Sequence, residues 1–481
     1  MRKTKIIVTI GPSSRDRDTL GKLIDAGMDC ARLNFSHGTL EEHAAVIQDI
    51  RQLSHEKGRQ VAVLQDLGGI KLRLGEVDGS IRLTPSQIVT MTPDTVSHHE
   101  DVLPFPQPGV LRNLQPGHLV YISDGTVCLE VMDAAPDEVK LQVRNASALL
   151  SSYKGVNLPG VTIDQPVLTE DDKLHLKFGV EQGVDWVALS FVRSAEDVAY
   201  AREYLDSIGC RALVMAKLER GEGIDNLDEI LDRSDAVMVA RGDLGVEIPM
   251  QKVPVVQKEI VRKANDAAKI SVIATQMLRS MVESPTPTRA EVSDITNAVL
   301  DGCDAILLSD ETAVGQFPVE TVQVADVTIR EAESVYPYHQ EHVSRDRTQA
   351  IASAAGRLVH SLHSKPIVIT STGRAAFEVS RFRPVNDIIV FSHEEAILRK
   401  LCLGWGLAPV GVVPIERDVA RLVASLVQAS LDSGMVKDDD VVTIVHGFLP
   451  GVSGTTNTIV VLDMQEYLSR TSGAQTATVP I

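Results

Sequence analysis

Short apolar runs recur along the first two thirds of the chain, and most of them end in a polar or charged residue. They lack strict alternation, which is typical of strands buried on both faces of a parallel sheet. One such run could equally be a segment of a buried helix, but eight in series favour strands. The eight runs cover residues 5–10, 31–35, 61–66, 186–191, 213–219, 236–243, 271–277 and 305–311.

Helical patterns separate these runs, for example at residues 15–26, 41–57, 195–207 and 253–268. From the fourth run onward the repeat is about 25 to 35 residues long, as expected of consecutive β–α units. Eight such units predict an α/β fold of the (β/α)₈ TIM barrel type.

Two further segments differ from the barrel pattern. Between the third and fourth strands, short alternating runs broken by Pro and Gly predict an inserted small β-barrel domain, placed as a lid over the active-site mouth. After residue 338, five apolar runs alternate with helical segments and predict a C-terminal open-sheet α/β domain. The predicted boundaries are 1–71 and 167–340 for the barrel, 72–166 for the lid and 341–481 for the C-terminal domain.

Composition and net charge limit which kinds of partner and which cellular location we expect. The net charge of −18 argues against nucleic acid, because binding phosphate backbones needs a basic face, but a local cluster of cations can still bind anionic metabolites. The five cysteines are dispersed without a C-x-x-C, which favours a reduced cytosolic chain over a disulfide framework or zinc site. No apolar run is long enough for a bilayer, and the strand pattern leaves no room for a signal peptide. We therefore expect a cytoplasmic protein without a membrane partner.

Polar residues collect where the predicted strands end, which is where TIM barrels carry their active sites. Arg32, Asn34 and Ser36 lie on one side at the second strand, a set suited to a phosphate and a hard cation, or simply a polar strand end. Lys217 and Glu219 point the same way at the fifth strand, where they could also form only a salt bridge.

The sixth and seventh strands complete the set. Asp243 stands between glycines that let a ligand approach the backbone, and Thr275 ends the seventh strand. Glu219 and Asp243 would supply two carboxylates from neighbouring strands, which suits Mg²⁺ when substrate and water fill the remaining positions. Cations, carboxylates and hydroxyls around one mouth predict a phosphoryl-transfer site.

Seven motifs resemble those of the pyruvate kinase family, in order and at family spacing from about residue 3 to 463. The resemblance implies Mg²⁺-dependent phosphoryl transfer from phosphoenolpyruvate to ADP, giving pyruvate and ATP, with Mn²⁺ as an alternative metal. The motifs are TKIIVTIGP (4–12), ARLNFSHG (31–38), KGVNLPG (154–160), ARGDLG (240–245), ATQM (274–277), PTRAE (287–291) and NAVLDG (297–302).

The resemblance also implies roles for individual residues. Glu219 and Asp243 would ligate the metal, Arg32 would clamp the phosphate, and Lys217 would neutralise the phosphoryl group in flight. Thr275 would lie near the methylene carbon, where either its hydroxyl or a water that it orders protonates the enolate. The backbone N–H groups of Gly242 and Asp243 would hold the substrate carboxylate. The residues expected at the nucleotide are Asn34, His37, Arg59 and Lys154, with Arg73 at the phosphates.

The chain departs from the usual family pattern at several positions. Members that require K⁺ typically carry Glu at the position of Lys71 and Thr at that of Leu67. The Lys71 ammonium could replace K⁺ beside Asn34, Ser36 and Asp66, so we expect K⁺ not to be required; the alternative is a surface lysine paired with a carboxylate. Ile70, Arg279 and Asp310 replace residues that are usually Pro, Glu and Gly, and none of these changes removes a catalytic group.

Two loops of the C-terminal domain predict an effector site. The first is a strand-to-helix turn whose backbone and hydroxyl donors, with Arg374, suit an anion, and the second is rich in glycine and hydroxyls. The alternative is that both are ordinary turns. By resemblance the ligand would be a phosphorylated small molecule and the assembly a homotetramer. The residues concerned are Ser371, Thr372, Gly373, Arg374, Ser453, Gly454 and Thr455.

Two other functions remain to be weighed. One is another Mg²⁺-dependent barrel enzyme acting through a pyruvate enolate, such as an aldolase or phosphoenolpyruvate mutase, which would not predict the lid after the third strand. The other is a catalytically inactive metabolite sensor, against which the complete set of Lys217, Glu219, Asp243 and Thr275 argues.

Overall fold

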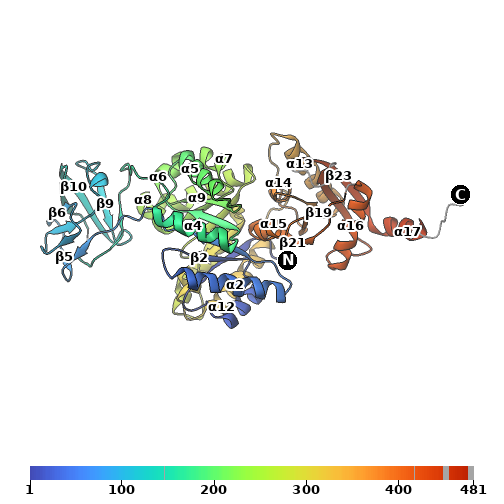
Figure 1. Cartoon of the computed structure of the whole chain (residues 1–481), viewed down its shortest axis with the longest axis horizontal. Coiled ribbons are helices and arrows are strands. Elements are labelled where there is room, and N and C mark those ends of the chain that lie inside the picture. Colours follow the sequence, from blue (N-terminus) through green and yellow to red (C-terminus); the bar gives the residue numbers. More distant parts are fainter. Residues whose placement is uncertain (146, 417, 448–453, 475–481) are drawn as a thin grey trace.

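A computed structural model describes residues 1–145, 147–416, 418–447 and 454–474 of the chain. Figure 1 shows a β-rich unit on one side, the barrel in the middle and the C-terminal domain on the other side. Within the described residues no helix combines the length and the apolar character needed to cross a membrane.

Eight parallel strands close into a barrel in the order β1-β18-β17-β16-β15-β14-β3-β2, which confirms the predicted TIM barrel. Nearly every strand residue is buried, which explains why these runs are apolar without alternation. The strands are β1 (Lys5–Thr9), β2 (Cys30–Asn34), β3 (Ala62–Asp66), β14 (Trp186–Leu189), β15 (Leu213–Leu218), β16 (Ala236–Ala240), β17 (Ile270–Ala274) and β18 (Ala305–Leu308).

Helices cover the outside of the barrel, and local sequence determines where several of them begin. Thr39, Thr169 and Thr288 each form a capping box with the acidic residue three positions later. A glycine of positive φ then ends the second and third of these helices, at Gly183 and Gly302. The covering helices are α1 (Arg17–Ala26), α2 (Leu40–Glu56), α4 (Glu170–Gln182), α5 (Ala195–Ser207), α7 (Leu227–Arg233), α9 (Val253–Asp266), α10 (Arg289–Asp301) and α12 (Pro318–Glu333).

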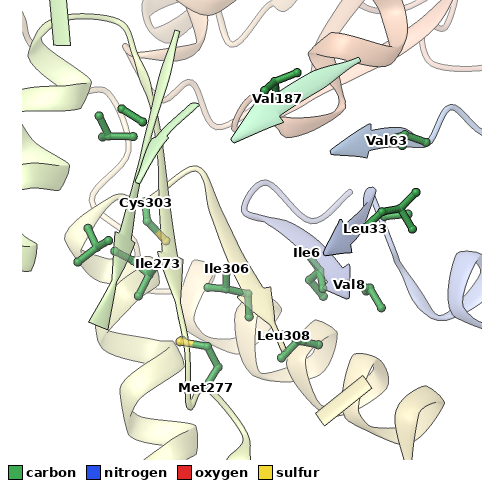
Figure 2. Packing of buried hydrophobic residues seen from close by; sticks show 14 of the residues in the cluster. Ile6, Val8, Leu33, Val63, Val187, Ile273, Met277, Cys303, Ile306 and Leu308 are labelled. Carbon is green, nitrogen blue, oxygen red and sulfur yellow. The ribbon is translucent and has the colours of Figure 1, made fainter. Parts of the chain in front are cut away.

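The two faces of the barrel strands pack into different cores. Ile6 and Val8 point outward and join the large cluster between strands and helices, part of which Figure 2 shows. Ile7, between them, points inward and joins a second cluster. Cys402 and Leu403 of the C-terminal domain belong to that inner cluster, so this domain packs against the barrel interior.

The insertion between β3 and β14 is β-rich, as predicted, and encloses a hydrophobic core of its own. Its strands form one six-stranded sheet, β13-β9-β10-β11-β6-β8, and two two-stranded sheets, β12-β5 and β4-β7. They are β4 (Glu76–Val77), β5 (Ile81–Leu83), β6 (Ile88–Thr92), β7 (Val96–Ser97), β8 (Val102–Pro104), β9 (Leu119–Ile122), β10 (Val127–Ala135), β11 (Glu138–Val143), β12 (Ala148–Leu150) and β13 (Val156–Asn157), with the short helix α3 (Pro108–Leu111).

The C-terminal domain is an open five-stranded sheet in the order β21-β20-β19-β22-β23, in which only the pairing of β22 with β23 is antiparallel. Its elements are α13 (Arg347–Leu362), β19 (Lys365–Ile369), α14 (Arg374–Ser380), β20 (Ile388–Ser392), α15 (Glu395–Lys400), β21 (Leu407–Val412), α16 (Val419–Asp432), β22 (Val441–Gly447), β23 (Thr456–Asp463) and α17 (Met464–Ala474). The exact domain boundaries stay predictions.

Arg383 joins the C-terminal domain to the barrel through a buried polar network. Its side chain is 2% exposed and its guanidinium donates to Asp304 Oδ1 at 2.9 Å and to the Gly302 carbonyl at 2.8 Å. The Trp405 ring lies 5.0 Å from the guanidinium carbon, and Trp186 Nε1 donates to the Lys400 carbonyl at 3.1 Å. Both tryptophans of the chain therefore report on this boundary.

Replacing Arg383 by methionine is expected to lower the free energy of unfolding by about 3–5 kcal/mol, because the Asp304 carboxylate would stay buried without its cation. Urea unfolding followed by tryptophan fluorescence measures the change. The matched control is Arg262→Met, which removes an exposed ion pair with Asp266 and should cost at most about 1 kcal/mol. Equal shifts of the unfolding midpoint in the two variants would contradict the expectation.

Candidate active site

Lys217 lies at the carboxyl end of β15 in the centre of a buried ionic network. Its Nζ donates to Ser190 Oγ at 2.7 Å and lies 3.0 Å from Glu219 Oε1 and 3.2 Å from Asp66 Oδ1. Burial by itself lowers the pKa of Lys217, but the Asp66 and Glu219 carboxylates outweigh it and hold that pKa above its ordinary value. Lys217 therefore carries a full positive charge at neutral pH.

Asp66, at the end of β3, links Lys217 to Arg32. Its Oδ2 accepts from Arg32 Nε at 2.6 Å, and Arg32 Nη1 donates to Thr9 Oγ1 at 2.9 Å. Burial tends to raise the pKa of Asp66, yet Lys217 and Arg32 together hold it below its ordinary value. From the sequence, Asp66 was predicted only for the monovalent-cation region. Its position at the end of a strand was the feature that could have predicted its contact with Arg32 and Lys217.

Glu219 and Asp243 are the two carboxylates predicted for the metal. Glu219 Oε2 accepts from the Phe191 N–H at 2.7 Å, whereas the Asp243 carboxylate has no hydrogen bond or ion pair among the described residues. Burial raises the pKa of Glu219; the Lys217 ammonium opposes this and the Asp243 charge adds to it, with a net rise. Two acidic groups that interact in this way suit a divalent cation placed between them.

No cluster of three or more His, Cys, Asp or Glu side chains in the described part of the chain is suited to a metal. The two carboxylates of Glu219 and Asp243 fit Mg²⁺, which usually takes one or two protein carboxylates and fills its octahedron with water and substrate oxygens.

Thr275 adopts a left-handed backbone conformation directly after β17, with φ of 71°, and its neighbour Gln276 does the same with φ of 56°. This costs on the order of 1–3 kcal/mol per residue and is typical of functional sites. The turn places Thr275 Oγ1 3.0 Å from the Gly242 N–H, which donates to it. Gly242 and Asp243 lie in the first turn of α8 (Arg241–Glu247), so both predicted substrate contacts lie beside Thr275.

Arg241 supports this strained turn and was missed by sequence reasoning. Its Nη2 donates to the Thr275 carbonyl at 2.7 Å and its Nε to the Ala274 carbonyl at 3.1 Å, while Nη1 pairs with Asp294 at 2.7 Å. Arg241 stands inside a quoted motif, but nothing in the motif indicates which way its side chain points.

Three predicted cations belong to the hinge between barrel and lid. Arg73 pairs with Gly155 in an isolated bridge and donates through Nη1 to the Tyr153 carbonyl at 3.0 Å, and the Lys154 carbonyl accepts from Leu74 N–H at 2.9 Å. Lys71 lies beside them, since a Cβ on Gly155 would be 3.8 Å from its Cε. Lys71 forms no ion pair with any described residue.

Asn34, Ser36 and His37 form the turn after β2. Asn34 Oδ1 accepts from the Ser36 N–H at 3.1 Å, and the Asn34 carbonyl accepts from the His37 N–H at 3.2 Å. A Cβ on Gly68 would lie 3.2 Å from Ser36 Oγ, so this turn packs against the end of the third strand.

Arg59 does not join the site, and its assignment to ADP is not retained. It precedes β3 and donates to the Ile24 carbonyl and to Asp29, which precedes β2. These positions mark the amino ends of the barrel strands, opposite to the face that carries Lys217 and Glu219. Arg59 is close in sequence to the third strand, but it precedes the amino end of that strand, and the site lies at the carboxyl end.

Comparison with known proteins agrees with this geometry. Residues 1–322 match the family "Pyruvate kinase, barrel domain" and residues 349–462 match "Pyruvate kinase, alpha/beta domain". A pyruvate kinase of Sporosarcina psychrophila is 40% identical over 98% of this chain and 82% of its own length. One of Thermococcus litoralis is 39% identical over 95% of this chain and 98% of its own length.

The chain belongs to the pyruvate kinase family. It is accordingly a phosphotransferase whose substrates are phosphoenolpyruvate and ADP, and its family works with a divalent metal. The alternatives of an aldolase and of a phosphoenolpyruvate mutase are thereby excluded.

Two departures from the pyruvate kinase pattern compensate each other. Arg279 Nη1 lies 2.6 Å from Asp310 Oδ2, and both side chains are more than half exposed. Arg279 stands where the family usually has Glu, and Asp310 where it usually has Gly. Because the two side chains pair with each other, Asp310 adds no net negative charge beside Ser309 and Glu311. Glu311 is buried and accepts from the Ser309 N–H at 2.7 Å and from the Leu278 N–H at 3.1 Å.

The loops expected to bind an effector meet at the start of α13. Arg374 pairs with Asp346, the N-cap of that helix, and the Thr370 hydroxyl accepts from the Gly373 N–H at 2.9 Å. Arg347 Nη2 reaches the Gly454 carbonyl at 3.5 Å. Ser371, Thr372, Gly454 and Thr455 lie within these loops, and Ser453 lies outside the described residues.

Proposed function

We propose that this chain transfers the phosphoryl group of phosphoenolpyruvate to ADP in a reaction that needs Mg²⁺ but not K⁺, and that a phosphorylated effector regulates it through the C-terminal domain. Lys217 is the strongest support: its permanently charged ammonium is fixed by Asp66, Glu219 and Ser190. Such a preorganised charge is what phosphoryl transfer requires, because the reaction depends on positioning and charge neutralisation.

In this proposal, residues from different barrel strands have different roles in the reaction. Arg32 binds the phosphate of phosphoenolpyruvate, and Lys217 neutralises the charge of the phosphoryl group as it moves. Glu219 and Asp243 would hold Mg²⁺, or Mn²⁺ in its place, which supplies positive charge to phosphate and enolate oxygens.

The remaining substrate contacts come from the sixth and seventh strands. The N–H groups of Gly242 and Asp243 bind the substrate carboxylate. When the substrate binds, the Gly242 N–H donates to this carboxylate and no longer to Thr275 Oγ1. Thr275, thus released, lies at the methylene carbon and directs the proton to it, from its own hydroxyl or from a water.

The nucleotide binds between barrel and lid. Arg73 and Lys154 approach its phosphates from the hinge, and Asn34 and His37 approach from the turn after β2. Support comes from the pairing of residues 73 and 155, which joins the backbones of the two segments that carry these cations. Closure of the lid would exclude water from the transferring phosphoryl group.

Lys71 would replace K⁺ as the monovalent charge near Asn34, Ser36 and Asp66. Its ammonium has no carboxylate partner among the described residues, whereas Asp66 is already bound by Arg32 and Lys217. An unpaired lysine at the hinge is free to approach substrate phosphates on lid closure.

Lys71→Glu is expected to convert the enzyme to K⁺ dependence, because the site would lose a charge and gain a ligand for the cation. With K⁺ omitted, the variant should lose at least about tenfold in kcat/KM, and K⁺ should restore most of it. Lys140→Glu, at an exposed position of strand β11 in the lid, is the matched charge reversal. Equal activity of Lys71→Glu with and without K⁺ would refute the role of Lys71.

The effector, the assembly and the location stay predictions. A sugar bisphosphate, a sugar monophosphate or a nucleotide would each offer the phosphate that Arg374 could exchange for Asp346. A homotetramer and a cytoplasmic location follow from family resemblance and composition alone.

The first test is pyruvate formation from phosphoenolpyruvate, ADP and Mg²⁺ in K⁺-free buffer, repeated with K⁺. Activity in both supports phosphoryl transfer to ADP without a need for K⁺. Activity only with K⁺ keeps the enzyme and removes the role of Lys71. Folded protein that forms no pyruvate in either buffer, with sugar-phosphate effectors tried, would favour the metabolite sensor.

A further inference from the structure

The lid returns to the barrel through residues 158–169, which form neither helix nor strand. Val161 and Ile163 nevertheless bury their side chains in the hydrophobic core of the lid. Further along the segment, Val167 and Leu168 bury their side chains in the barrel core instead, so the segment crosses from the lid to the barrel. How its backbone is attached to the barrel decides where the lid can sit.

Two arginines of the barrel hold that backbone. Arg220 Nη2 donates to the Val161 carbonyl at 3.0 Å, Arg193 Nη2 donates to the Gln165 carbonyl at 2.9 Å, and Arg193 Nη1 donates to the Ile163 carbonyl. The acceptors alternate along the chain, so the two guanidiniums bind one side of an extended segment. We call these two arginines and three carbonyls the hinge clamp.

Both guanidiniums are themselves fixed by carboxylates. Arg193 pairs with Asp197 through Nε at 3.0 Å and Nη2 at 2.7 Å. Arg220 pairs with Glu222 at 3.0 Å through Nε and through Nη2, and its side chain is only 4% exposed. Guanidinium forks that are held in this way define a geometry more closely than flexible lysines do.

The clamp stands next to the metal site. Arg220 directly follows Glu219 in the chain, and Arg193 lies two residues after Phe191, whose N–H binds Glu219. Beyond Arg220, at 4.0 Å from its Nη2, lies Oε2 of Glu247, a side chain that is 2% exposed. That oxygen has no hydrogen-bond partner among the described residues.

Glu247 ends α8, the helix whose first turn carries Gly242 and Asp243. The lid touches the same helix, since a Cβ on Gly125 would lie 3.4 Å from Val246 Cγ2. Arg193, Arg220, Asp243 and Glu247 also line one cavity together with the two hinge segments at residues 70–72 and 155–157. The clamp, α8 and the hinge segments thus meet around one cavity.

We propose that the hinge clamp positions the lid for the nucleotide, and that Arg193 and Arg220 are positioning residues for ADP in the reaction proposed above, on which this inference rests. Arg73 and Lys154 travel with the lid, whereas Arg32 and Lys217 belong to the barrel. Weakening the clamp therefore lowers the share of molecules whose lid residues are in place for ADP and leaves the phosphoenolpyruvate contacts intact.

The test uses Arg193→Lys and Arg220→Lys in the full chain, since lysine keeps the charge but loses the fork. KM for ADP is expected to rise about 5- to 20-fold, because fewer molecules are competent to bind it, while KM for phosphoenolpyruvate changes less than about twofold. Hydrogen exchange of the amides in residues 158–169 should be faster than in the parent chain.

Arg202→Lys is the matched control. Arg202 also binds one carbonyl, of Arg233 at 2.7 Å, and one carboxylate, of Asp235 at 2.7 Å, but it lies on α5 away from the lid. An unchanged KM for ADP in the clamp variants would overturn the inference. So would an equal rise of KM for ADP and KM for phosphoenolpyruvate that also occurs in Arg202→Lys. A parent chain without activity would refute the proposed reaction instead, and hydrogen exchange would still show whether the clamp holds the hinge.

Discussion

Lys217→Met is expected to lower kcat for pyruvate formation by about 10³-fold or more, with a much smaller change in KM for phosphoenolpyruvate. The ammonium acts on charge that develops during transfer, so its loss falls on the transition state and not on ground-state binding. Arg32 still clamps the phosphate in the variant, because its contacts with Asp66 and Thr9 do not involve Lys217. Steady-state kinetics at saturating substrates measure both constants.

Two controls accompany this variant. Lys258→Met removes a lysine that is 56% exposed on α9, away from the strand ends, and should leave kcat unchanged. Circular dichroism and the unfolding midpoint establish that Lys217→Met is folded, since Asp66 and Glu219 lose a partner. A folded variant whose kcat stays within tenfold of the parent value would remove Lys217 from the mechanism.

Glu219→Gln is expected to lower kcat/KM by about 10²- to 10³-fold and to raise the Mg²⁺ concentration for half-maximal activity at least tenfold. The amide keeps an oxygen to accept from Phe191 N–H but removes one of the two negative charges that would bind the cation. A Mg²⁺ titration of the initial rate measures the shift. Chelation of the metal should abolish activity of the parent chain, and excess Mg²⁺ should restore it.

The matched control is Glu196→Gln, an exposed glutamate at the start of α5. It makes the same chemical change at a distance from the strand ends and should shift neither constant. An unchanged Mg²⁺ requirement in a folded Glu219→Gln variant would mean that Glu219 serves only to hold Lys217.

Local sequence was sufficient for the barrel and for most of the candidate site. Buried strands must be apolar on both faces, so the eight strands were visible as runs, and the residue just after each run had to lie at one mouth. Chain order and that rule were enough to bring Arg32, Lys217, Glu219, Asp243 and Thr275 together.

The prediction for Arg59 did not follow the rule that residues at the carboxyl end of a barrel strand lie at the catalytic mouth. Arg59 precedes its strand and therefore lies at the opposite end of the barrel, bound to Asp29. The two unusual residues Arg279 and Asp310 had no explanation when each was considered alone, because they form an ion pair with each other.

The sequence by itself determined which residues enter strands, which end of each strand carries chemistry, and that a β-rich insertion interrupts the barrel and an α/β domain follows it. These follow from periodicity and from chain order, which are local properties. Only the tertiary structure decided that Asp66 joins Arg32 to Lys217, that Ser190 fixes the ammonium, and that Arg193 and Arg220 hold the hinge. Such contacts depend on the register and closure of the barrel, which bring polar groups from distant parts of the chain within hydrogen-bonding or ion-pair distance, and no local pattern records which of them will meet.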